Sequence, residues 1–320
     1  DVYKRQPYYH RFLKSFPGVA VLAGAPQALV LKHWEGLGYY ARARNLHRAA
    51  GLVMRNHQGR VPTEWEAFRA LPGVGDYIAA AVLSIAFDRP YAVVDGNVKR
   101  VLARLLCIDL PVNVQKNHAH FRRHADALLD HRSPADFNQA LMELGALVCR
   151  PGTPKCKACP LMTVCCAFQQ KRVATYPRRQ NRPKIPQRQV ATAVIQRRGK
   201  LLLTQRPADG LLGGLWEFPN AVRTGDESPP STCRRLAREQ LGLDIAVGDF
   251  ITRVNHAYTH FKIQAHSYLC SSPRGRVRLV GPAAFRWIEL EQLDDFALPK
   301  ATHKLLPALR QRLRMNPTIV

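Results

Sequence analysis

Four of the eight cysteines in this chain lie close together, running from Cys149 through Cys156 and Cys159 to Cys165 with the spacing C-x6-C-x2-C-x5-C. Four thiolates at such short spacing can bind one metal centre without ligands from distant parts of the chain. Both zinc and a [4Fe–4S] cluster accept four cysteines. Zinc sites usually combine two C-x2-C pairs, and because this segment has one, its spacing favours the cluster. Cys166 is an alternative to Cys165 as the fourth ligand.

A single acid precedes three cations in VVDGNVKRVLARL, residues 93–105. Asp is a favoured N-cap residue because its carboxylate accepts hydrogen bonds from the N–H groups of the first helical turn. Asp95 is therefore well placed to cap a helix that begins near Val98. Taken alone, this residue is most simply interpreted as a helix cap.

A short turn rich in glycine lies between two helical stretches in LPGVGDYIAAAV, residues 71–82. Gly73 and Gly75 flank Val74, and two glycines at this spacing allow a tight turn whose backbone N–H groups can bind phosphate. Many helix–helix turns contain such a pair, so the turn alone is weak evidence for a phosphate site.

Basic residues outnumber acidic ones, with 48 Lys and Arg against 23 Asp and Glu and a formal net charge of +25. A field of this sign attracts polyanions, and nucleic acid is the leading candidate partner, ahead of a membrane surface or a role in solubility alone. The longest apolar run, residues 77–87, is too short to span a bilayer, so we expect no membrane association. An apolar content of 46% is normal for folded domains.

The pattern of apolar residues changes along the chain. Residues 1–170 show helical periodicity, whereas residues 189–320 contain alternating segments typical of strands, with a turn at Arg198-Gly199. Between them, residues 171–188 hold seven Lys or Arg, three Pro and no acid, which is typical of an extended connector. We therefore expect a multi-domain protein with an all-α domain, a basic linker and an α+β domain. The clearest helices are predicted over 39–57, 63–71, 133–148, 230–241 and 299–313.

The glycine turn, the VVDGNVKR segment and the cysteine spacing together closely resemble the endonuclease III-type family of helix-hairpin-helix DNA glycosylases. Within that family, WEGLGYYARARNLHRAA (34–50) and the C-terminal half resemble the adenine DNA glycosylases of the MutY type. The resemblance implies a helical glycosylase domain over 1–170 with an iron–sulfur loop at 149–165, then a Nudix-like domain over 189–320. It also implies that Cys165, rather than Cys166, completes a [4Fe–4S] cluster.

The resemblance assigns chemistry to Asp95. In such glycosylases the matching carboxylate stays ionised at a helix N-terminus and stabilises the oxocarbenium-like sugar that forms when the base leaves C1′. Asn97 is expected to orient it. Bifunctional relatives carry a nucleophilic lysine where this chain has Tyr77, so we expect base removal without efficient strand cleavage.

The resemblance also assigns contacts to DNA. Tyr39 matches the aromatic residue that wedges into the base stack beside the damaged base and fills the gap left by the extruded adenine. The C-terminal residues Tyr258, Thr259 and His260 match a loop that reads 8-oxoguanine. The expected contacts to the DNA backbone are Gly73, Val74, Gly75, Lys99 and Arg100.

One catalytic group of such glycosylases has no counterpart in this sequence. Relatives carry a glutamate just before the segment matching PYYHRF, where it protonates the departing adenine. Here that segment is preceded only by DVYKRQ. We therefore expect a chain that lacks its N-terminal segment and, as it stands, is nearly inactive.

The expected function is removal of adenine mispaired with 8-oxoguanine or guanine in double-stranded DNA, by a monomer in the bacterial cytoplasm, on the nucleoid. The alternatives are a bifunctional glycosylase/lyase, a non-catalytic DNA-binding remnant and a Nudix phosphohydrolase. The last is disfavoured because the segment matching the Nudix signature, residues 234–244, keeps Glu239 but lacks two of the three acids that bind Mg²⁺.

Overall fold

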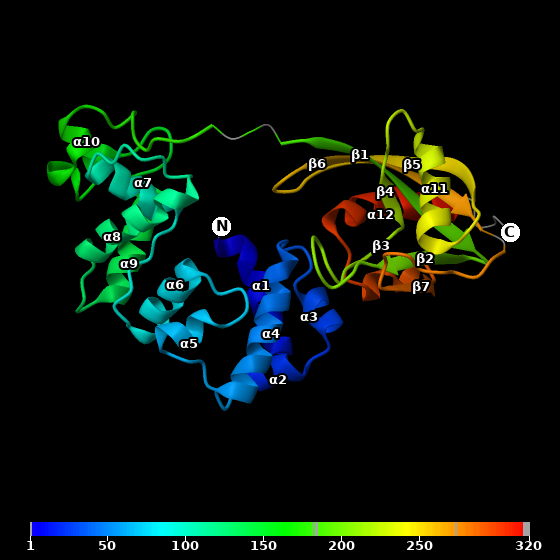
Figure 1. The fold of residues 1–320 in the computed structure, drawn as a ribbon, viewed down its shortest axis with the longest axis horizontal. Coiled ribbons are helices and arrows are strands. Elements are labelled where there is room, and N and C mark those ends of the chain that lie inside the picture. Colours follow the sequence, from blue (N-terminus) through cyan, green and yellow to red (C-terminus); the bar gives the residue numbers. More distant parts are fainter. Residues whose placement is uncertain (1, 182, 184, 273, 316–320) are drawn as a thin grey trace. The chain divides into compact units, whose positions relative to one another are not determined.

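The protein is described by a computed structural model that covers residues 2–181, 183, 185–272 and 274–315 (Figure 1). It divides into two compact units, one formed by residues 60–183 and the other by residues 1–59 together with 184–320. The helical segment expected over 1–170 thus contributes to both units, and the unit of residues 60–183 extends past residue 170. The unit of residues 60–183 contains α5 (Trp65–Arg69), α6 (Asp76–Phe87), α7 (Gly96–Leu105), η1 (Gln115–Asn117), α8 (His118–Leu128), α9 (Pro134–Glu143), the π-helix η2 (Leu144–Val148), η3 (Cys156–Ala158), η4 (Met162–Val164) and α10 (Cys166–Gln169).

The other unit joins four helices from the start of the chain to a mixed sheet. Its helices pack around a core that contains Phe16, Leu31 and Tyr40, and this core also includes Leu215 and Ala297 from the sheet part of the chain. Its elements are α1 (Val2–Ser15), α2 (Val19–Gly24), α3 (Gln27–His33), α4 (Tyr40–Asn56), β1 (Gln187–Arg197), β2 (Lys200–Gln205), β3 (Trp216–Glu217), β4 (Asn220–Val222), α11 (Pro229–Leu241), β5 (Ala246–Ala257), β6 (Lys262–Ser271), β7 (Ala284–Ile288), η5 (Glu291–Asp295) and α12 (Lys300–Met315).

The sheet has the strand order β3-β2-β1-β6-β5, with β4 paired to β1 and β7 to β2. The pairing of β1 with β6 is parallel and the others are antiparallel. Alternate residues of β1 face opposite sides of the sheet. Val190 and Val194 pack in one core with α12, while Ala191 and Ile195 pack in a second core with α11. A strand covered on both faces explains the continuous apolar run that the sequence shows there.

Local sequence signals explain where several helices begin and end. Ser228 caps α11 by accepting a hydrogen bond from the Ser231 N–H, and Gly242 ends this helix with φ +63°. The helix predicted over 63–71 is shorter in the structure because Glu64, not Thr63, is the N-cap residue. The helix predicted over 133–148 changes at Leu144 into η2. Among the described residues, no helix has both the length and the apolar character needed to cross a membrane.

The unit of residues 60–183 contains the helix-hairpin-helix that the sequence predicts, formed by α5, a tight turn and α6. The helix α6 buries Ala79, Ala80 and Leu83, and Gly75 is its N-cap residue. The helix α7 buries Val98 and Leu102 in a core shared with α8 and α9. The sheet, the helical hairpin and the strand turn at Arg198-Gly199 together confirm the expected combination of a helical domain with an α+β domain.

Candidate functional site

Asp95 lies in an open pocket of about 560 Å³ in the unit of residues 60–183. The pocket is formed by the first turns of α6 and α7, the loop that leads into α8, and one residue of the basic linker. Of the predicted site residues, it brings together Asp95, Gly75, Tyr77 and Lys99. It also contains residues that the sequence analysis did not identify: Arg69, Asp76, Asn113, Gln115, His118 and Arg179.

The carboxylate of Asp95 is held from both sides. Its Oδ1 accepts a hydrogen bond from the Val98 N–H at 2.7 Å, which makes Asp95 the N-cap of α7 as its sequence position predicts. Its Oδ2 accepts a hydrogen bond from the Asn97 side-chain amide at 3.0 Å. A carboxylate held by these two donors is restricted in orientation.

The segment that leads into Asp95 is fixed by Asn138 of α9, a residue that no sequence motif singles out. Its Oδ1 accepts from the Val93 N–H at 2.9 Å, and its amide donates to the Tyr91 carbonyl and the Ser84 hydroxyl. Asn138 is 1% exposed. Because a buried amide that satisfies several partners tolerates little movement, Asn138 sets the position from which the chain enters Asp95.

The hairpin presents two amide groups to solvent. Gly73 has φ +79°, a conformation that favours glycine. The N–H groups of Gly73 and Gly75 have no protein acceptor within the described part of the chain, so they can bind an anion. The expectation for Val74 needs correction, since its N–H already donates to the Leu71 carbonyl and its carbonyl accepts from Arg69.

Lys99 and Arg100 differ sharply in position. Lys99 lines the pocket, and burial lowers its pKa. Arg100 is 4% exposed, and its guanidinium donates to the carbonyls of Cys149 at 2.7 Å and Gly145 at 2.6 Å and to Oδ1 of Asn97 at 2.9 Å. The prediction that Arg100 contacts DNA is therefore wrong, because internal acceptors bind the cation. Its contact with Asn97 instead links Arg100 to the residue that holds Asp95.

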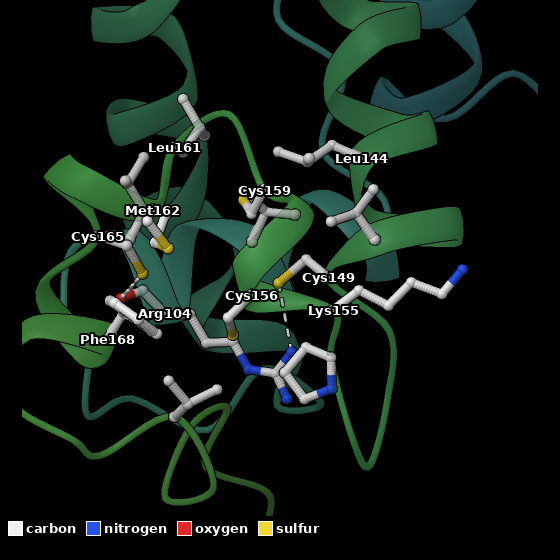
Figure 2. A pocket seen from close by; sticks show the side chains of 15 residues that line it. Arg104, Leu144, Cys149, Lys155, Cys156, Cys159, Leu161, Met162, Cys165 and Phe168 are labelled. Atoms are coloured by element: carbon white, nitrogen blue, oxygen red, sulfur yellow. Dashed lines mark hydrogen bonds between the residues drawn. The ribbon is translucent and has the colours of Figure 1, made fainter.

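The four predicted metal ligands line one pocket beside α7 (Figure 2). Arg104 lies next to them and donates to the Cys149 Sγ at 3.3 Å, to the Arg150 carbonyl and to the Tyr176 carbonyl. The Cys165 thiol donates to the Arg104 carbonyl at 3.5 Å. The remaining walls are mostly apolar and include Leu105, Leu144, Leu161, Met162 and Phe168.

Both zinc and an iron–sulfur cluster accept four cysteine thiolates. Within the described residues, no three His, Cys, Asp or Glu side chains are grouped so that they could hold one metal ion. The four thiols line a shared pocket. Cys166 forms a disulfide with Cys107 and so does not compete with Cys165.

The cysteine loop and the π-helix η2 before it are packed tightly against α7. A Cβ on Gly145 of η2 would lie 2.7 Å from the Asn97 Cβ, so only glycine allows this approach. Arg100 and Arg104 bond to carbonyl groups of Gly145, Cys149 and Arg150 from the same helix. Two of the three cations of α7, Arg100 and Arg104, therefore hold the cysteine loop in place.

Two predicted DNA-contact regions from distant parts of the sequence meet in the unit formed by residues 1–59 and 184–320. Tyr39 is 64% exposed, has φ +48° and lies under the guanidinium of Arg42 at 4.9 Å. The Thr259 hydroxyl donates to the Tyr39 hydroxyl at 3.4 Å. A non-glycine residue with positive φ is strained, and such strain is common at binding sites.

The predicted C-terminal reading loop, residues 258–260, is divided between surface and interior. Thr259 and His260 are exposed between β5 and β6. Tyr258 packs against His256 and Phe261, with ring centroids 4.6 and 5.0 Å away, and burial raises its pKa to about 12. The ring of Tyr258 thus supports the loop from inside, and the two exposed residues are those that can reach a base.

Glu35, between α3 and the Tyr39 turn, joins the N-terminal helices to the end of the sheet part of the chain. Its carboxylate accepts hydrogen bonds from the Leu298 N–H at 2.8 Å, from His303 at 2.8 Å and from Lys32 at 2.7 Å. Burial raises the pKa of Glu35, but these hydrogen bonds outweigh burial and the pKa lies at about 2. No sequence pattern indicates the contacts of Glu35 with Leu298 and His303, because these residues lie far from Glu35 in the chain.

We predict that Glu35→Gln destabilises the protein at neutral pH by about 3 kcal/mol, the linkage value of a carboxyl pKa lowered from 4.5 to about 2. The lowered pKa means that the stabilisation is complete above about pH 4.5 and is lost as the pH falls towards 2. Urea unfolding of wild type and Glu35→Gln between pH 7 and pH 2.5 should show that the difference in their free energies of unfolding becomes smaller as the pH falls. Glu64→Gln, which removes an exposed partner of Arg89, is the control and should change stability little. A difference between wild type and Glu35→Gln that does not depend on pH would contradict the prediction.

Arginine binds the acid that remains in the Nudix-like segment and a second acid just before α11. Arg235 of α11 contacts the carboxylates of Glu239 at 3.1 Å and Glu227 at 3.0 Å. The hydrogen bond from Arg235 is the main cause of the lowered pKa of Glu227, which is about 2. The carboxylates of Glu227 and Glu239 are therefore in an ion-pair network, where they act as structural partners.

Comparison with known proteins assigns the two parts of the chain. Residues 5–121 match the HhH-GPD superfamily of base excision DNA repair proteins, and residues 190–308 match the NUDIX domain. The adenine DNA glycosylase of Mus musculus is 33% identical over 345 residues, covering 93% of this chain and 67% of the mouse protein. The adenine DNA glycosylase of Schizosaccharomyces pombe is 30% identical over 345 residues, covering 91% of this chain and 73% of the yeast protein.

Two solved structures are similar to parts of this chain. A thermostable thymine-DNA glycosylase covers 52% of this chain and 76% of its own, with 30% identity and a TM-score of 0.48. The MutT protein of Methanosarcina mazei covers 41% of this chain and 98% of its own, with 22% identity and a TM-score of 0.39.

Proposed function

Since the chain belongs to the adenine DNA glycosylase family of the HhH-GPD superfamily, we propose that it excises adenine mispaired with 8-oxoguanine in double-stranded DNA. The observation that carries the chemical part of this proposal is the Asp95 carboxylate. It lies in an open pocket, and its oxygens accept from the Val98 N–H and the Asn97 amide.

Asp95 is placed to act on the sugar. When the bond between C1′ and adenine breaks, positive charge develops on the deoxyribose, and a fixed anion next to it lowers the energy of that state. Because the Asn97 amide and the Val98 N–H in the first turn of α7 already orient the carboxylate, little reorganisation is needed as the charge forms. Lys99, which also lines the pocket, is placed to hold a flanking phosphate.

The proton for the departing adenine has to come from another group. In the described part of the pocket, Asp76 is the other carboxylate besides Asp95. The hydrogen bond from Arg69 is the main cause of the lowered pKa of Asp76, so this group is ionised at neutral pH and is a poor acid. Activity is therefore best measured in single-turnover reactions, with enzyme in excess over DNA.

We propose a [4Fe–4S] cluster bound by Cys149, Cys156, Cys159 and Cys165. When bound, the cluster supplies a rigid, redox-capable centre that cross-links the loop 149–165. In this chain the loop in turn receives hydrogen bonds from Arg100 and Arg104 of α7. The residues of the loop would therefore position the helix whose first turn holds Asp95.

Recognition of the opposite base is proposed for Tyr39, Thr259 and His260. The Tyr39 ring is exposed and can insert into the base stack. The adjoining hydroxyl of Thr259 and the imidazole of His260 offer hydrogen-bond partners to an oxidised guanine. The contact between Thr259 and Tyr39 supports this proposal because it places the wedge and the reading loop side by side.

We predict base removal without strand cleavage, and a lysine at the hairpin should add the missing step. In single-turnover reactions on an 8-oxoguanine:adenine duplex, wild-type protein should give strand breaks only after alkali. Tyr77 lines the Asp95 pocket, so Tyr77→Lys places an amine where it can attack C1′. This variant should cleave without alkali and form a covalent adduct that borohydride traps, whereas Tyr77→Phe should do neither.

The same reaction separates the alternative functions. Strand cleavage by wild type without alkali would indicate a bifunctional glycosylase/lyase and overturn the monofunctional assignment. Tight binding with no abasic product would indicate a non-catalytic DNA-binding protein. Failure of Tyr77→Lys to form an adduct despite normal adenine release would show that residue 77 does not face C1′.

A further inference from the structure

The first part of the basic linker is attached to the Asp95 pocket. The Arg178 carbonyl accepts from the Val112 N–H at 3.0 Å. Asn113 contacts Gln180 twice, because its amide donates to the Gln180 carbonyl at 2.8 Å and its Oδ1 accepts from the Gln180 N–H at 2.9 Å. This two-sided contact, here called the Asn113 clamp, holds the backbone after Arg179, and the Val112–Arg178 hydrogen bond holds the backbone before it. The expectation of a plain extended connector is therefore incomplete for these residues.

The two adjacent arginines of this segment have different surroundings. Arg178 contacts the Asp109 carboxylate at 3.3 Å and is not among the residues of the Asp95 pocket. Arg179 lines that pocket and forms no ion pair with any described acidic residue. Its positive charge contributes to the lowered pKa of Arg100, for which burial is the larger cause. Alternation along an extended chain explains why neighbours with the same charge face different partners.

The pocket around Arg179 concentrates donors and positive charge. Lys99 and His118 line it with Arg179, and burial followed by the charge of Lys99 lowers the pKa of His118. Of the two carboxylates present, Asp76 is bound by Arg69 and Asp95 accepts from α7. Cations gathered in this way repel each other unless an anion joins them.

We propose that Arg179, held by the Asn113 clamp, binds a backbone phosphate next to the nucleotide whose sugar lies at Asp95. The proposal rests on the proposed function, because it takes DNA as the anion. A guanidinium suits this task since its planar donors match phosphate oxygens in pairs. Linker and catalytic pocket thus form one DNA-binding surface within the unit of residues 60–183, and Asn113 is a positioning residue that acts through Arg179.

Salt dependence of DNA binding tests the proposal. Each phosphate contact contributes about 0.9 to the slope of log K against log salt concentration for B-DNA. With an 8-oxoguanine:adenine duplex between 50 and 200 mM NaCl, Arg179→Ala should lower the magnitude of the slope by about 0.9, and Arg179→Lys should retain it. Arg178→Ala removes the same charge one residue away and is the matched control, with a slope close to that of wild type.

Variants of the clamp test how Arg179 is held. Asn113→Ala should lower the slope towards that of Arg179→Ala, and the double variant should lower it no further, as expected for two residues that act as one. Thermal unfolding shows whether each variant is folded. Asn113→Asp keeps the acceptor of the clamp, and its salt slope is measured as a second variant at this position. An unchanged slope for Arg179→Ala, or equal losses for Arg178→Ala and Arg179→Ala, would overturn the proposal. If wild type removes adenine normally while either of these slope results is found, the proposed function stands and only the phosphate contact of Arg179 is rejected.

Discussion

Replacement of Asp95 by asparagine is expected to lower the single-turnover rate of adenine release by about a hundred- to a thousandfold, the range found when one fixed electrostatic contact to a transition state is lost. Asparagine is as good an N-cap residue as aspartate, so α7 should still begin at Gly96. The change therefore removes the negative charge and preserves the cap. The rate is measured with enzyme in excess over an 8-oxoguanine:adenine duplex.

A second substitution at the same position separates the two roles of Asp95. Asp95→Ala loses charge and cap together, so it should be as slow as Asp95→Asn and also less stable by about 1 kcal/mol. Urea unfolding measures the stability difference. A rate for Asp95→Asn within a few-fold of wild type, with only Asp95→Ala impaired, would show that Asp95 serves as a helix cap alone.

Replacement of Cys149 by serine is expected to have the second largest effect, namely loss of the cluster and with it most DNA binding. The sulfur and carbonyl of Cys149 both accept hydrogen bonds from α7, through Arg104 and Arg100. When the loop loses its cluster, these arginines lose fixed acceptors, and a buried cation without partners is strongly destabilising. Absorbance near 410 nm, about where iron–sulfur clusters absorb, reports the cluster.

Cys166→Ser provides the matched control for the cysteine loop. Cys166 follows Cys165 directly in the sequence but forms a disulfide with Cys107, so its loss should leave the absorbance and the iron content unchanged. Cys165→Ser should lose both. Retention of the absorbance in Cys165→Ser together with its loss in Cys166→Ser would reverse the assignment of the fourth ligand. A colourless wild-type protein that contains zinc would contradict the cluster itself.

The two largest effects share a physical basis in α7. The first turn of this helix holds Asp95, and its buried arginines hold the cysteine loop through Gly145, Cys149 and Arg150. Gly145 allows the loop to approach Asn97 closely enough for this contact. A change in the loop is therefore transmitted to the carboxylate through one rigid element.

Features set by neighbours in the sequence could be predicted. Asp95 capping α7 depends on residues three positions apart. The turn at Arg198-Gly199 and the α11 helix follow from local turn and capping signals. The cysteine loop could be recognised for the same reason, since all four residues lie in one segment.

Features that depend on partners far apart in the chain could not be predicted. The charge of Arg100 suggested a phosphate contact, but the acceptors that bind it come from a segment about 45 residues later. Asn138 carries no motif, and only the fold shows that its amide fixes Val93. Arg179 was predicted only as part of an extended connector, because nothing in the local sequence distinguishes it from Arg178.

The contact between Tyr39 and Thr259 could be predicted only in part. Each residue was identified from its own segment, but nothing in the sequence indicates that they share a hydrogen bond. The contacts of Glu35 with Leu298 and His303 likewise join the N-terminal helices to α12 and the segment before it. We infer that long-range polar contacts, which have no sequence period, are what sequence patterns miss in this fold.

The central claim is that a fixed anion at Asp95 stabilises positive charge on the sugar. It is tested most directly by binding of two abasic duplexes opposite 8-oxoguanine, one with a pyrrolidine whose protonated nitrogen replaces C1′ and one with a neutral tetrahydrofuran. Wild type should bind the cationic duplex at least about a hundredfold more tightly, as expected for a transition-state mimic, and Asp95→Asn should lose most of this preference. Equal binding of the two duplexes by wild type, or an undiminished preference in Asp95→Asn, would contradict the account.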